Sequence, residues 1–86
     1  MKDVLFKGDA LSHMYYWLHN DRKMLDKIYD LLRDIGRNGV AKGIGKPEKL
    51  KYKKGWSRRI TDEHRLVYDV DEDNVIHVYS CKGHYE

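Results

Sequence analysis

The chain has 86 residues, of which 41% are hydrophobic, and its formal net charge is +3. A chain of this length supports one small domain with a single core, so we expect one domain over residues 1–86. It contains no run of about 20 apolar residues that could span a membrane, and its first residues lack the order of a signal peptide. Cys81 is the one cysteine, which excludes an internal disulfide and a cysteine zinc site. We therefore expect a cytoplasmic protein without membrane attachment, in which Cys81 is a small buried apolar residue.

The positive charge is concentrated in the middle of the chain. Residues 37–65 hold ten basic and three acidic residues, whereas residues 1–36 hold six of each. Residues 66–86 hold one basic and five acidic residues. A concentrated basic segment attracts phosphate backbones through counterion release and diffusional steering, so we expect a nucleic-acid partner. The alternative is a solvated surface that only keeps the protein soluble.

The first half of the chain predicts a short strand followed by a pair of helices. Residues 4–6 are strand-like, and Gly8-Asp9 ends them, with Asp9 placed to cap the first helix. Asn20-Asp21 separates this helix from a second one, which Gly36 and Gly39 end. Apolar residues at helical spacing are Ala10, Met14, Trp17 and Leu18 in the first helix, and Leu25, Ile28, Leu31, Leu32 and Ile35 in the second.

The second half of the chain predicts a sheet. Residues 37–55 lack regular periodicity, whereas residues 56–61, 64–70 and 75–82 are rich in aromatic and β-branched residues. Residues 50–52 are a further short strand candidate. Consecutive strands joined by short turns form an antiparallel meander. We therefore predict an α+β fold in which the N-terminal strand and the two-helix hairpin pack on a twisted antiparallel β-sheet, with one face free to bind a ligand.

Strand alternation places an arginine on the free face of this sheet. In residues 64–70 the apolar side chains share one face, which we expect to contact the helices, and Arg65 points the other way. Only one of Arg58 and Arg59 can share the face of Arg65. Periodicity alone does not decide which of the two it is.

Two residues of the basic segment could carry chemistry on RNA. Cleavage without a metal requires a base for the ribose 2′-OH, a cation for the phosphate and an acid for the leaving 5′-oxygen. Glu48 is the one acidic residue in residues 35–61, and the lysines around it favour the ionised form that a base needs. The alternative is an ordinary solvated glutamate. Arg65 can present a bidentate fork to a phosphate, or it can form a salt bridge to Asp69 or Glu63.

The C-terminus supplies a candidate for the acid. His84 follows the last strand candidate, and a histidine can transfer a proton near neutral pH. Tyr85 can stack on a base or bond a phosphate. The alternative for both is a frayed terminal tail. We expect the other histidines to be structural, as for His64 and His77, or to lie on helix surfaces, as for His13 and His19.

Six further basic residues of the middle segment are predicted to contact the RNA backbone. They are Lys46, Lys51, Lys53, Lys54, Arg58 and Arg59. Trp56 is predicted to belong to the core rather than to a platform for bases. The sequence predicts no cofactor, and no H-E-x-x-H or comparable spacing predicts a bound metal.

Taken in order, these residues resemble the YoeB/Txe family of bacterial toxin ribonucleases, within the RelE superfamily. The segments that carry the resemblance are Gly45-Lys-Pro-Glu-Lys-Leu-Lys51, Trp56-Ser-Arg-Arg-Ile-Thr-Asp-Glu-His-Arg-Leu-Val-Tyr68 and Lys82-Gly-His-Tyr85. Tyr15-Tyr-Trp17, Asp21-Arg-Lys23 and the second helix also match. The resemblance covers nearly the whole chain, and the block ending at Tyr68 together with a terminal His-Tyr is specific.

The resemblance implies a toxin endoribonuclease with defined partners. Such a protein enters the ribosomal A site and cuts mRNA there, leaving a 2′,3′-cyclic phosphate or 3′-phosphate and a 5′-OH. Its partners are the ribosome, the mRNA and a cognate antitoxin of the YefM/Axe type, whose disordered tail folds onto the toxin. Members of the family are commonly dimeric.

The resemblance also assigns roles to individual residues. It implies that Glu48 is the general base, that Arg65 stabilises the transition state and that His84 is the general acid. Tyr85 matches the terminal tyrosine that helps to orient the substrate. Residues implied to touch RNA or to organise the site are Lys51, Arg59 and Glu63.

Three features depart from the family pattern. Glu86 extends past the tyrosine that usually ends the chain, and Gly83 stands where a larger residue is common. The loop from Lys51 to Trp56 is shorter than in relatives by about two residues. None of these departures removes a side chain with an implied catalytic role.

Two competing functions fit parts of the same sequence. Related toxins of the ParE branch share the fold and act on DNA gyrase without the nuclease residues. A plain RNA-binding module would explain the basic segment alone. The joint presence of Glu48, Arg65, His84 and Tyr85 favours the ribonuclease over both alternatives.

Overall fold

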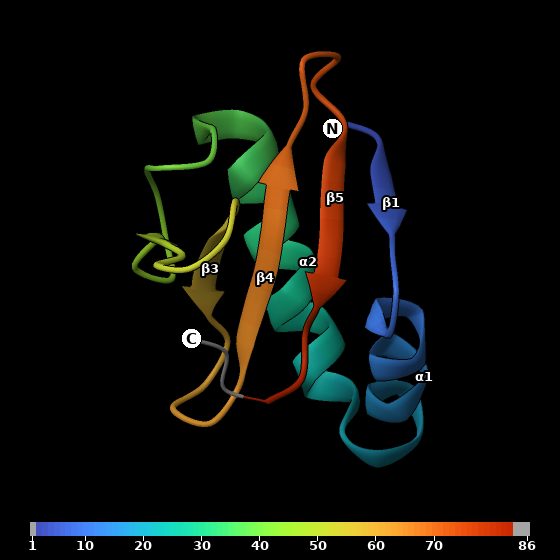
Figure 1. Ribbon diagram of the computed structural model, residues 1–86. Helices are drawn as coiled ribbons and strands as arrows, with labels where there is room; N and C mark the ends of the chain where they lie inside the picture. The colour runs from blue at the N-terminus through green and yellow to red at the C-terminus, as the bar shows by residue number, and fades with distance from the viewer. Residues whose placement is uncertain (1, 84–86) are drawn as a thin grey trace.

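Two helices cover one face of a five-stranded mixed sheet in the computed structural model, which describes residues 2–83 (Figure 1). The elements in chain order are β1 (Val4–Phe6), α1 (Ala10–Asn20), α2 (Arg22–Asn38), β2 (Glu48–Lys49), β3 (Trp56–Arg59), β4 (Arg65–Val70) and β5 (Ile76–Ser80). The order of strands across the sheet is β1-β5-β4-β3-β2. In Figure 1, α2 passes behind the sheet, and the face toward the viewer carries no helix. We call this second face the open face.

The strand pairing confirms the predicted α+β fold and adds one detail to it. Strands β2 to β5 pair antiparallel with their neighbours, as a meander does. Strand β1 instead pairs parallel with β5, with Val4 opposite Ile76. The first strand therefore forms one edge of the sheet beside the last strand, and the sheet is mixed.

The helices begin and end close to the predicted residues, with two differences, at Asp9 and at Gly36. Asp21 caps α2 as predicted, because its side chain accepts a hydrogen bond from the Lys23 N–H at 3.2 Å. Asp9 precedes α1 without a side-chain cap bond. Gly36 does not end α2, which continues to Asn38, and Gly39 ends it with a φ of 87°.

One short strand also lies elsewhere than predicted. Residues 50–52 are not a strand, because β2 is formed by Glu48 and Lys49 opposite Ser57 and Trp56. The backbone N–H of Leu50 donates to the Gly55 carbonyl at 3.0 Å and closes the turn that follows. The strand therefore lies earlier in the chain than expected, and it includes Glu48.

The core lies between α2 and the helix-facing side of the sheet. Ile28 and Ile35 of α2 are fully buried, and so are Leu66, Tyr68 and Val78 of the sheet. This confirms the predicted apolar stripe of the second helix and the predicted face of β4. Full burial of each such aliphatic side chain contributes about 1.5–3 kcal/mol to stability.

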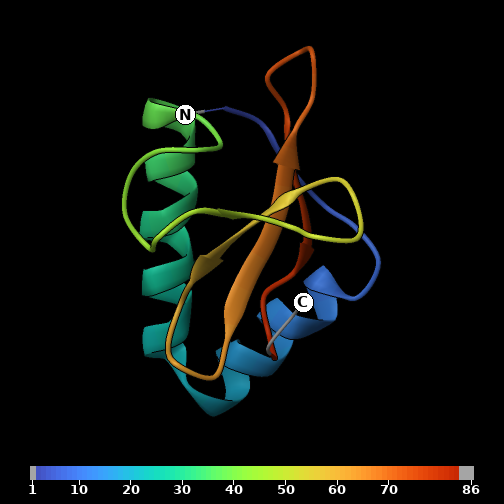
Figure 2. The same cartoon turned by 60° about the vertical axis from the view of Figure 1, so that its left-hand side comes forward.

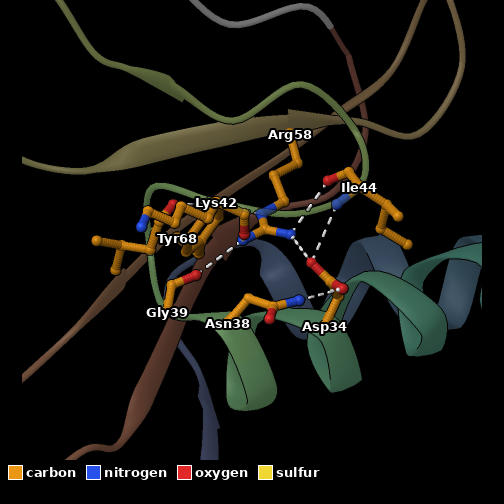
Figure 3. A network of polar contacts seen from close by, with 8 residues as sticks. Asp34, Asn38, Gly39, Lys42, Ile44, Arg58 and Tyr68 are labelled. Atoms are coloured by element: carbon orange, nitrogen blue, oxygen red, sulfur yellow. Dashed lines mark hydrogen bonds and ion pairs between the residues drawn. The ribbon is translucent and has the colours of Figure 1, made fainter.

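A charged residue, Arg58, also belongs to this core. It lies directly opposite Leu66 in the β3–β4 ladder, so its side chain enters the helix-facing side and has no exposed surface. Its guanidinium forms an ion pair with Asp34 of α2 at 2.5 Å (Figure 3). Its Nε donates to the Tyr68 hydroxyl at 2.8 Å, and that hydroxyl donates to the Val40 carbonyl at 2.6 Å. A buried cation requires such partners to offset its desolvation.

The same guanidinium holds the loop between α2 and β2. Its terminal nitrogens donate to three backbone carbonyls of that loop, those of Gly39 at 2.8 Å, Lys42 at 2.7 Å and Ile44 at 3.1 Å. Gly43 has a φ of 118°, and a Cβ atom there would collide with Asp34 Oδ2. The loop can therefore close over the ion pair only because position 43 lacks a side chain.

We predict that Gly43→Ala lowers the free energy of unfolding by at least about 2 kcal/mol, because the new methyl group strains the backbone and displaces Asp34 from Arg58. Gly8→Ala is the matched control, since Gly8 also has a positive φ, 56°, but open space around its Cβ position. It should cost about 1 kcal/mol. Urea denaturation followed by tryptophan fluorescence measures both variants, and equal losses would show that backbone strain alone acts at position 43.

Asp34 gives the fold a defined sensitivity to acid. Burial alone would raise the pKa of Asp34, but hydrogen bonds from Arg58, from the Ile44 N–H and from Asn38 outweigh burial and hold the pKa below its usual value. A carboxyl group with a pKa that is lower in the folded state contributes stability above its unfolded pKa of about 3.9. That stability is lost as the pH falls through the folded pKa.

We therefore predict that the free energy of unfolding decreases as the pH is lowered below about 4. The Asp34→Asn variant should be less stable at pH 7 and should show a shallower pH dependence in the acidic range, because position 34 no longer titrates. Denaturant titrations at a series of pH values measure both curves. Parallel curves for the two proteins would contradict the assignment of this acid sensitivity to Asp34.

Candidate active site on the open face

Three neighbouring strands bring a carboxylate, a hydroxyl and a guanidinium together on the open face. In the register, Ser57 of β3 lies opposite Glu48 of β2 and opposite Val67 of β4. Residues that lie opposite one another on adjacent strands share a face. Arg65 is two residues from Val67 and therefore points to the same face, away from the helices.

The Arg65 side chain is held in place by Ser57. Its Nε donates to Ser57 Oγ at 3.0 Å, and its Nη2 lies 3.4 Å from the Ser57 carbonyl oxygen. Only 10% of the Arg65 side chain is exposed, so the charge lies largely within the protein surface. A guanidinium fixed in this way can bind a phosphate without first losing much conformational freedom.

Glu48 is the ion-pair partner of this arginine. Glu48 Oε1 lies 3.5 Å from Arg65 Nη2, and 70% of the Glu48 side chain is exposed. Within residues 2–83, the salt bridge of Arg65 is thus to Glu48, and not to Asp69 or Glu63, which were the partners considered in the alternative interpretation of Arg65. The separation exceeds the about 2.7–2.9 Å of a strong charge-assisted hydrogen bond. An incoming phosphate can therefore compete with Glu48 for the guanidinium.

This arrangement can perform acid–base chemistry on a phosphodiester. The guanidinium can bind the phosphate, and the exposed carboxylate beside it can accept a proton from a neighbouring hydroxyl. Such a proton transfer needs the two groups on one surface and within reach of the same ligand. Glu48 and Arg65 meet that requirement.

The two adjacent arginines of β3 have opposite environments. Arg59 lies opposite Arg65, so it is the one that shares the open face, and its side chain is 45% exposed and 3.4 Å from Asp62. The prediction that Arg58 contacts RNA does not fit its position, because Arg58 is completely buried and bonded to Asp34 and to the preceding loop. Alternation along β3 explains the difference.

The other predicted RNA contacts lie on the surface near β2 and β3. Lys46 is exposed just before β2, with a φ of 52°. Lys51 and Lys54 are exposed in the turn between β2 and β3, and Glu63 is exposed in the turn before β4. Their contacts with RNA remain predictions.

The segment after β5 is tied to helix α1 and to the start of β4. The Cys81 carbonyl accepts a hydrogen bond from Trp17 Nε1 at 2.9 Å, and its N–H donates to His13 Nδ1 at 3.1 Å. His64 Nδ1 accepts from the Gly83 N–H at 2.8 Å, in agreement with its expected structural role. The expectation that His13 lies on a helix surface is wrong, because it is half-buried against this segment.

The described chain ends beside the strand that carries Arg65. The Gly83 carbonyl accepts a hydrogen bond from the Arg65 N–H at 3.0 Å. His84, Tyr85 and Glu86 lie outside the described residues, so their predicted roles stay predictions. Burial raises the pKa of the Cys81 thiol to about 12, which agrees with the expected buried and unreactive residue.

Sequence reasoning missed the part that Ser57 plays. Its signal is the alternation of β3, because a residue two positions before Arg59 must share the face of Arg59. A small hydroxyl side chain on that face is placed to accept a bond from an arginine on the next strand. The sequence alone does not decide which of Arg58 and Arg59 lies on the open face, and it therefore does not place Ser57 on that face either.

The structure points to no metal centre in the part of the chain that it describes. Between residues 2 and 83, no group of three or more His, Cys, Asp or Glu side chains could hold a metal ion. Over the same residues, neither helix has the length and apolar character to cross a membrane.

Comparison with known families decides where the chain belongs. The family of YoeB-like toxins of bacterial type II toxin-antitoxin systems matches residues 6–85. The chain belongs to the YoeB toxin family. It is 44% identical over 84 residues to Toxin YoeB of Escherichia coli K12, covering 95% of this chain and 98% of that protein. It is 42% identical over 87 residues to Toxin RelK of Mycobacterium tuberculosis, covering 99% and 100%.

Solved structures of YoeB proteins share this fold. The toxin in a heterotetrameric YoeB-YefM complex from Staphylococcus aureus superposes with a TM-score of 0.90 at 49% identity, covering 99% of both chains. A YoeB dimer from the same organism gives 0.91 at 51% identity, covering 98% of both chains. A Helicobacter pylori toxin, at 17% identity, and Escherichia coli YafQ H87Q, at 14%, show the fold alone, with TM-scores of 0.77 and 0.73.

We predict that the two arginines of β3 respond differently to truncation. Arg58→Ala should lower the free energy of unfolding by about 3–5 kcal/mol, because it leaves Asp34 and the loop carbonyls without their buried partner. Arg59→Ala should change it by about 0.5 kcal/mol or less, since its side chain is partly exposed. Thermal and urea denaturation measure both variants. Similar losses for the two would contradict the assignment of Arg58 to the core and Arg59 to the surface.

Proposed function

We propose that this YoeB-type toxin is a ribosome-dependent endoribonuclease that cuts mRNA in the ribosomal A site and thereby inhibits translation. The observation that carries the proposal is the pair formed by Glu48 and Arg65, 3.5 Å apart on the open face. The basic surface around β2 and β3 supports it, because Arg59 lies opposite Arg65 in the sheet and the exposed Lys46 and Lys51 lie within three residues of Glu48 in the chain. The family membership supports the toxin part of the proposal.

In the proposed reaction Glu48 is the general base. Its carboxylate accepts the proton of the ribose 2′-OH, and the 2′-oxygen attacks the adjacent phosphorus. The bond to the 5′-oxygen breaks, which leaves a 2′,3′-cyclic phosphate on one fragment and a 5′-OH on the other. The exposure of Glu48 gives a ribose access to it.

Arg65 stabilises the charge that develops on the phosphate. Its guanidinium is held by Ser57 before a ligand arrives, so little reorganisation is required in the transition state. The resemblance to the family adds His84 as the acid that protonates the leaving 5′-oxygen, and Tyr85 as the residue that orients the substrate. No step in this scheme requires a metal or a cofactor.

The partners proposed for this chain follow from its relatives. A Staphylococcus aureus relative assembles with YefM in a heterotetramer, and YoeB from that organism forms a dimer. We propose that this chain likewise binds a YefM-type antitoxin and forms a homodimer. Its other partners are the ribosome and the mRNA, which place its action in the cytoplasm.

The test of the proposed function is primer extension on mRNA bound to bacterial ribosomes, with purified protein and its Glu48→Gln variant. We predict a new 5′ end within the A-site codon for the unchanged protein. Loss of a general base costs about 10²- to 10⁴-fold in rate, and Glu48→Gln should lose cleavage to that extent. Glu72→Gln is the matched control, because Glu72 is an exposed carboxylate of the β4–β5 turn and should leave the rate unchanged.

Two outcomes would contradict the proposal. Full activity of the Glu48→Gln protein would remove Glu48 as the base. Absence of a cut by either protein, when both are folded and bind ribosomes, would remove the ribonuclease activity itself. DNA gyrase would then be the next target to assay.

A further inference from the structure

A hollow of about 390 Å³ opens on the surface of the sheet. Its lining residues come from β4, from β5 and from the turn between β2 and β3, and they are Leu50, Lys53, Lys54, Val67, Tyr79 and Ser80. Val67 and Leu50 are 3% and 8% exposed, and they give the hollow an apolar floor. None of these side chains has a part in the chemistry proposed above.

The wall formed by Tyr79 results from an irregularity in β5. Val67 lies opposite Ser80, but the next residue of β4, Tyr68, lies opposite Val78. Tyr79 is therefore the extra residue of a β-bulge, which redirects a side chain out of the regular ladder. Its ring is nearly parallel to that of His77, with centroids 6.4 Å apart and 20° between the planes, and Tyr79 is 42% exposed. The bulge thus presents a supported aromatic ring to the hollow.

The turn between β2 and β3 brings positive charge to the rim. The bond from the Leu50 N–H to the Gly55 carbonyl closes this turn, and Gly55 has a φ of 129°. A Cβ at Gly55 would lie 3.2 Å from both Leu50 Cδ1 and the Tyr68 carbonyl oxygen, so the turn lies close to β4. Figure 2 shows this yellow segment passing across β4. Lys53 and Lys54 of the turn are among the residues that line the hollow.

The position of the hollow relates it to the phosphate site. Val67 follows Arg65 by two residues on the same face of β4, a step of about 7 Å along a strand. Leu50, which also lines the hollow, follows β2 directly and begins the turn after Glu48 and Lys49. The distance from the Arg65 guanidinium, which binds the scissile phosphate in the proposed reaction, to the hollow is therefore one that a single nucleotide can span.

We propose that this hollow is a subsite for an unpaired RNA base next to the scissile phosphate, with Tyr79 as its stacking surface. An apolar floor, an exposed aromatic ring and ammonium groups at the rim are the features that bind single-stranded nucleic acid, because every base has a face that stacks and a phosphate beside it. The location of the subsite rests on the proposed function. A side chain of a protein partner is the competing occupant, and continuity with the phosphate site favours RNA.

Binding can be measured without cleavage in the full-length Glu48→Gln protein. The probe is an RNA trinucleotide with 2′-deoxyribose at the central position, titrated while the NMR signals of the Val67 methyl groups and the Tyr79 ring are followed. We expect both signals to shift. Tyr79→Ala should weaken binding about tenfold or more, and Tyr79→Phe should keep it within about twofold, because stacking needs the ring and not the hydroxyl.

Two controls separate stacking from a general disturbance of the protein. The first control uses trinucleotides in which one base at a time is replaced by an abasic residue. We expect that removal of one particular base abolishes the difference in affinity between the protein with Tyr79 and its Tyr79→Ala variant. Tyr29→Ala should leave affinity unchanged, because Tyr29 is a similarly exposed tyrosine on α2.

The outcomes distinguish this inference from the proposed function. Absence of NMR shifts at Val67 and Tyr79 would overturn the subsite even if the protein cuts mRNA on ribosomes. The same holds if Tyr79→Ala lowers the affinity for the intact trinucleotide and for every abasic trinucleotide by the same factor. If Tyr79→Ala binds the trinucleotide with unchanged affinity but binds a YefM-type antitoxin more weakly, the hollow belongs to the protein partner. That result would also overturn the RNA subsite. Base-dependent binding in a protein that cuts no mRNA would keep the subsite and remove the nuclease.

Discussion

The buried guanidinium of Arg58 is the constraint on which the rest of the structure depends. A charge without exposed surface is stable only with a full set of partners, and these come from Asp34 on α2, Tyr68 on β4 and the loop after α2. The helix, the loop and two strands are thereby joined at one point, as Figure 3 shows. The loop continues to Gly45, whose carbonyl accepts from the Arg59 N–H at 2.7 Å, and then into β2 with Glu48. The position of the proposed base is thus linked to the ion pair in the core.

The open face uses the same strands for a different purpose. Alternation along β3 sends Arg58 into the core, while Ser57 and Arg59 point outward toward the face that carries Arg65. The guanidinium of Arg65 is oriented by Ser57 and is only partly engaged by Glu48, so it remains available to an anion. One strand therefore separates two arginine sites, of which one stabilises the fold and the other is suited to a ligand.

Much of this could be predicted from the sequence, and the failures have physical causes. The apolar stripe of α2 and the alternation of β4 are local patterns, and they predicted the helix-facing side of the sheet correctly. The fate of Arg58 depends on Asp34, which is 24 residues away, and on backbone carbonyls that no pattern of side chains reveals. The bulge at Tyr79 is a shift in register between two strands, which alternation within one strand cannot show. The pairing of Glu48 with Arg65 was likewise missed, because it depends on the register of three strands and not on the sequence around either residue.

The parallel pairing of β1 with β5 affects how the protein folds during its synthesis. Strand β1 has its hydrogen-bonding neighbour in β5, and α1 is fastened to the residue after β5 through Trp17 and His13. Contacts between such distant parts of a chain form late and slow the search for the native state. During synthesis from the N-terminus, the first strand and helix lack these partners until the last strand has been made. The five-stranded sheet can therefore be completed only after β5 has been synthesised.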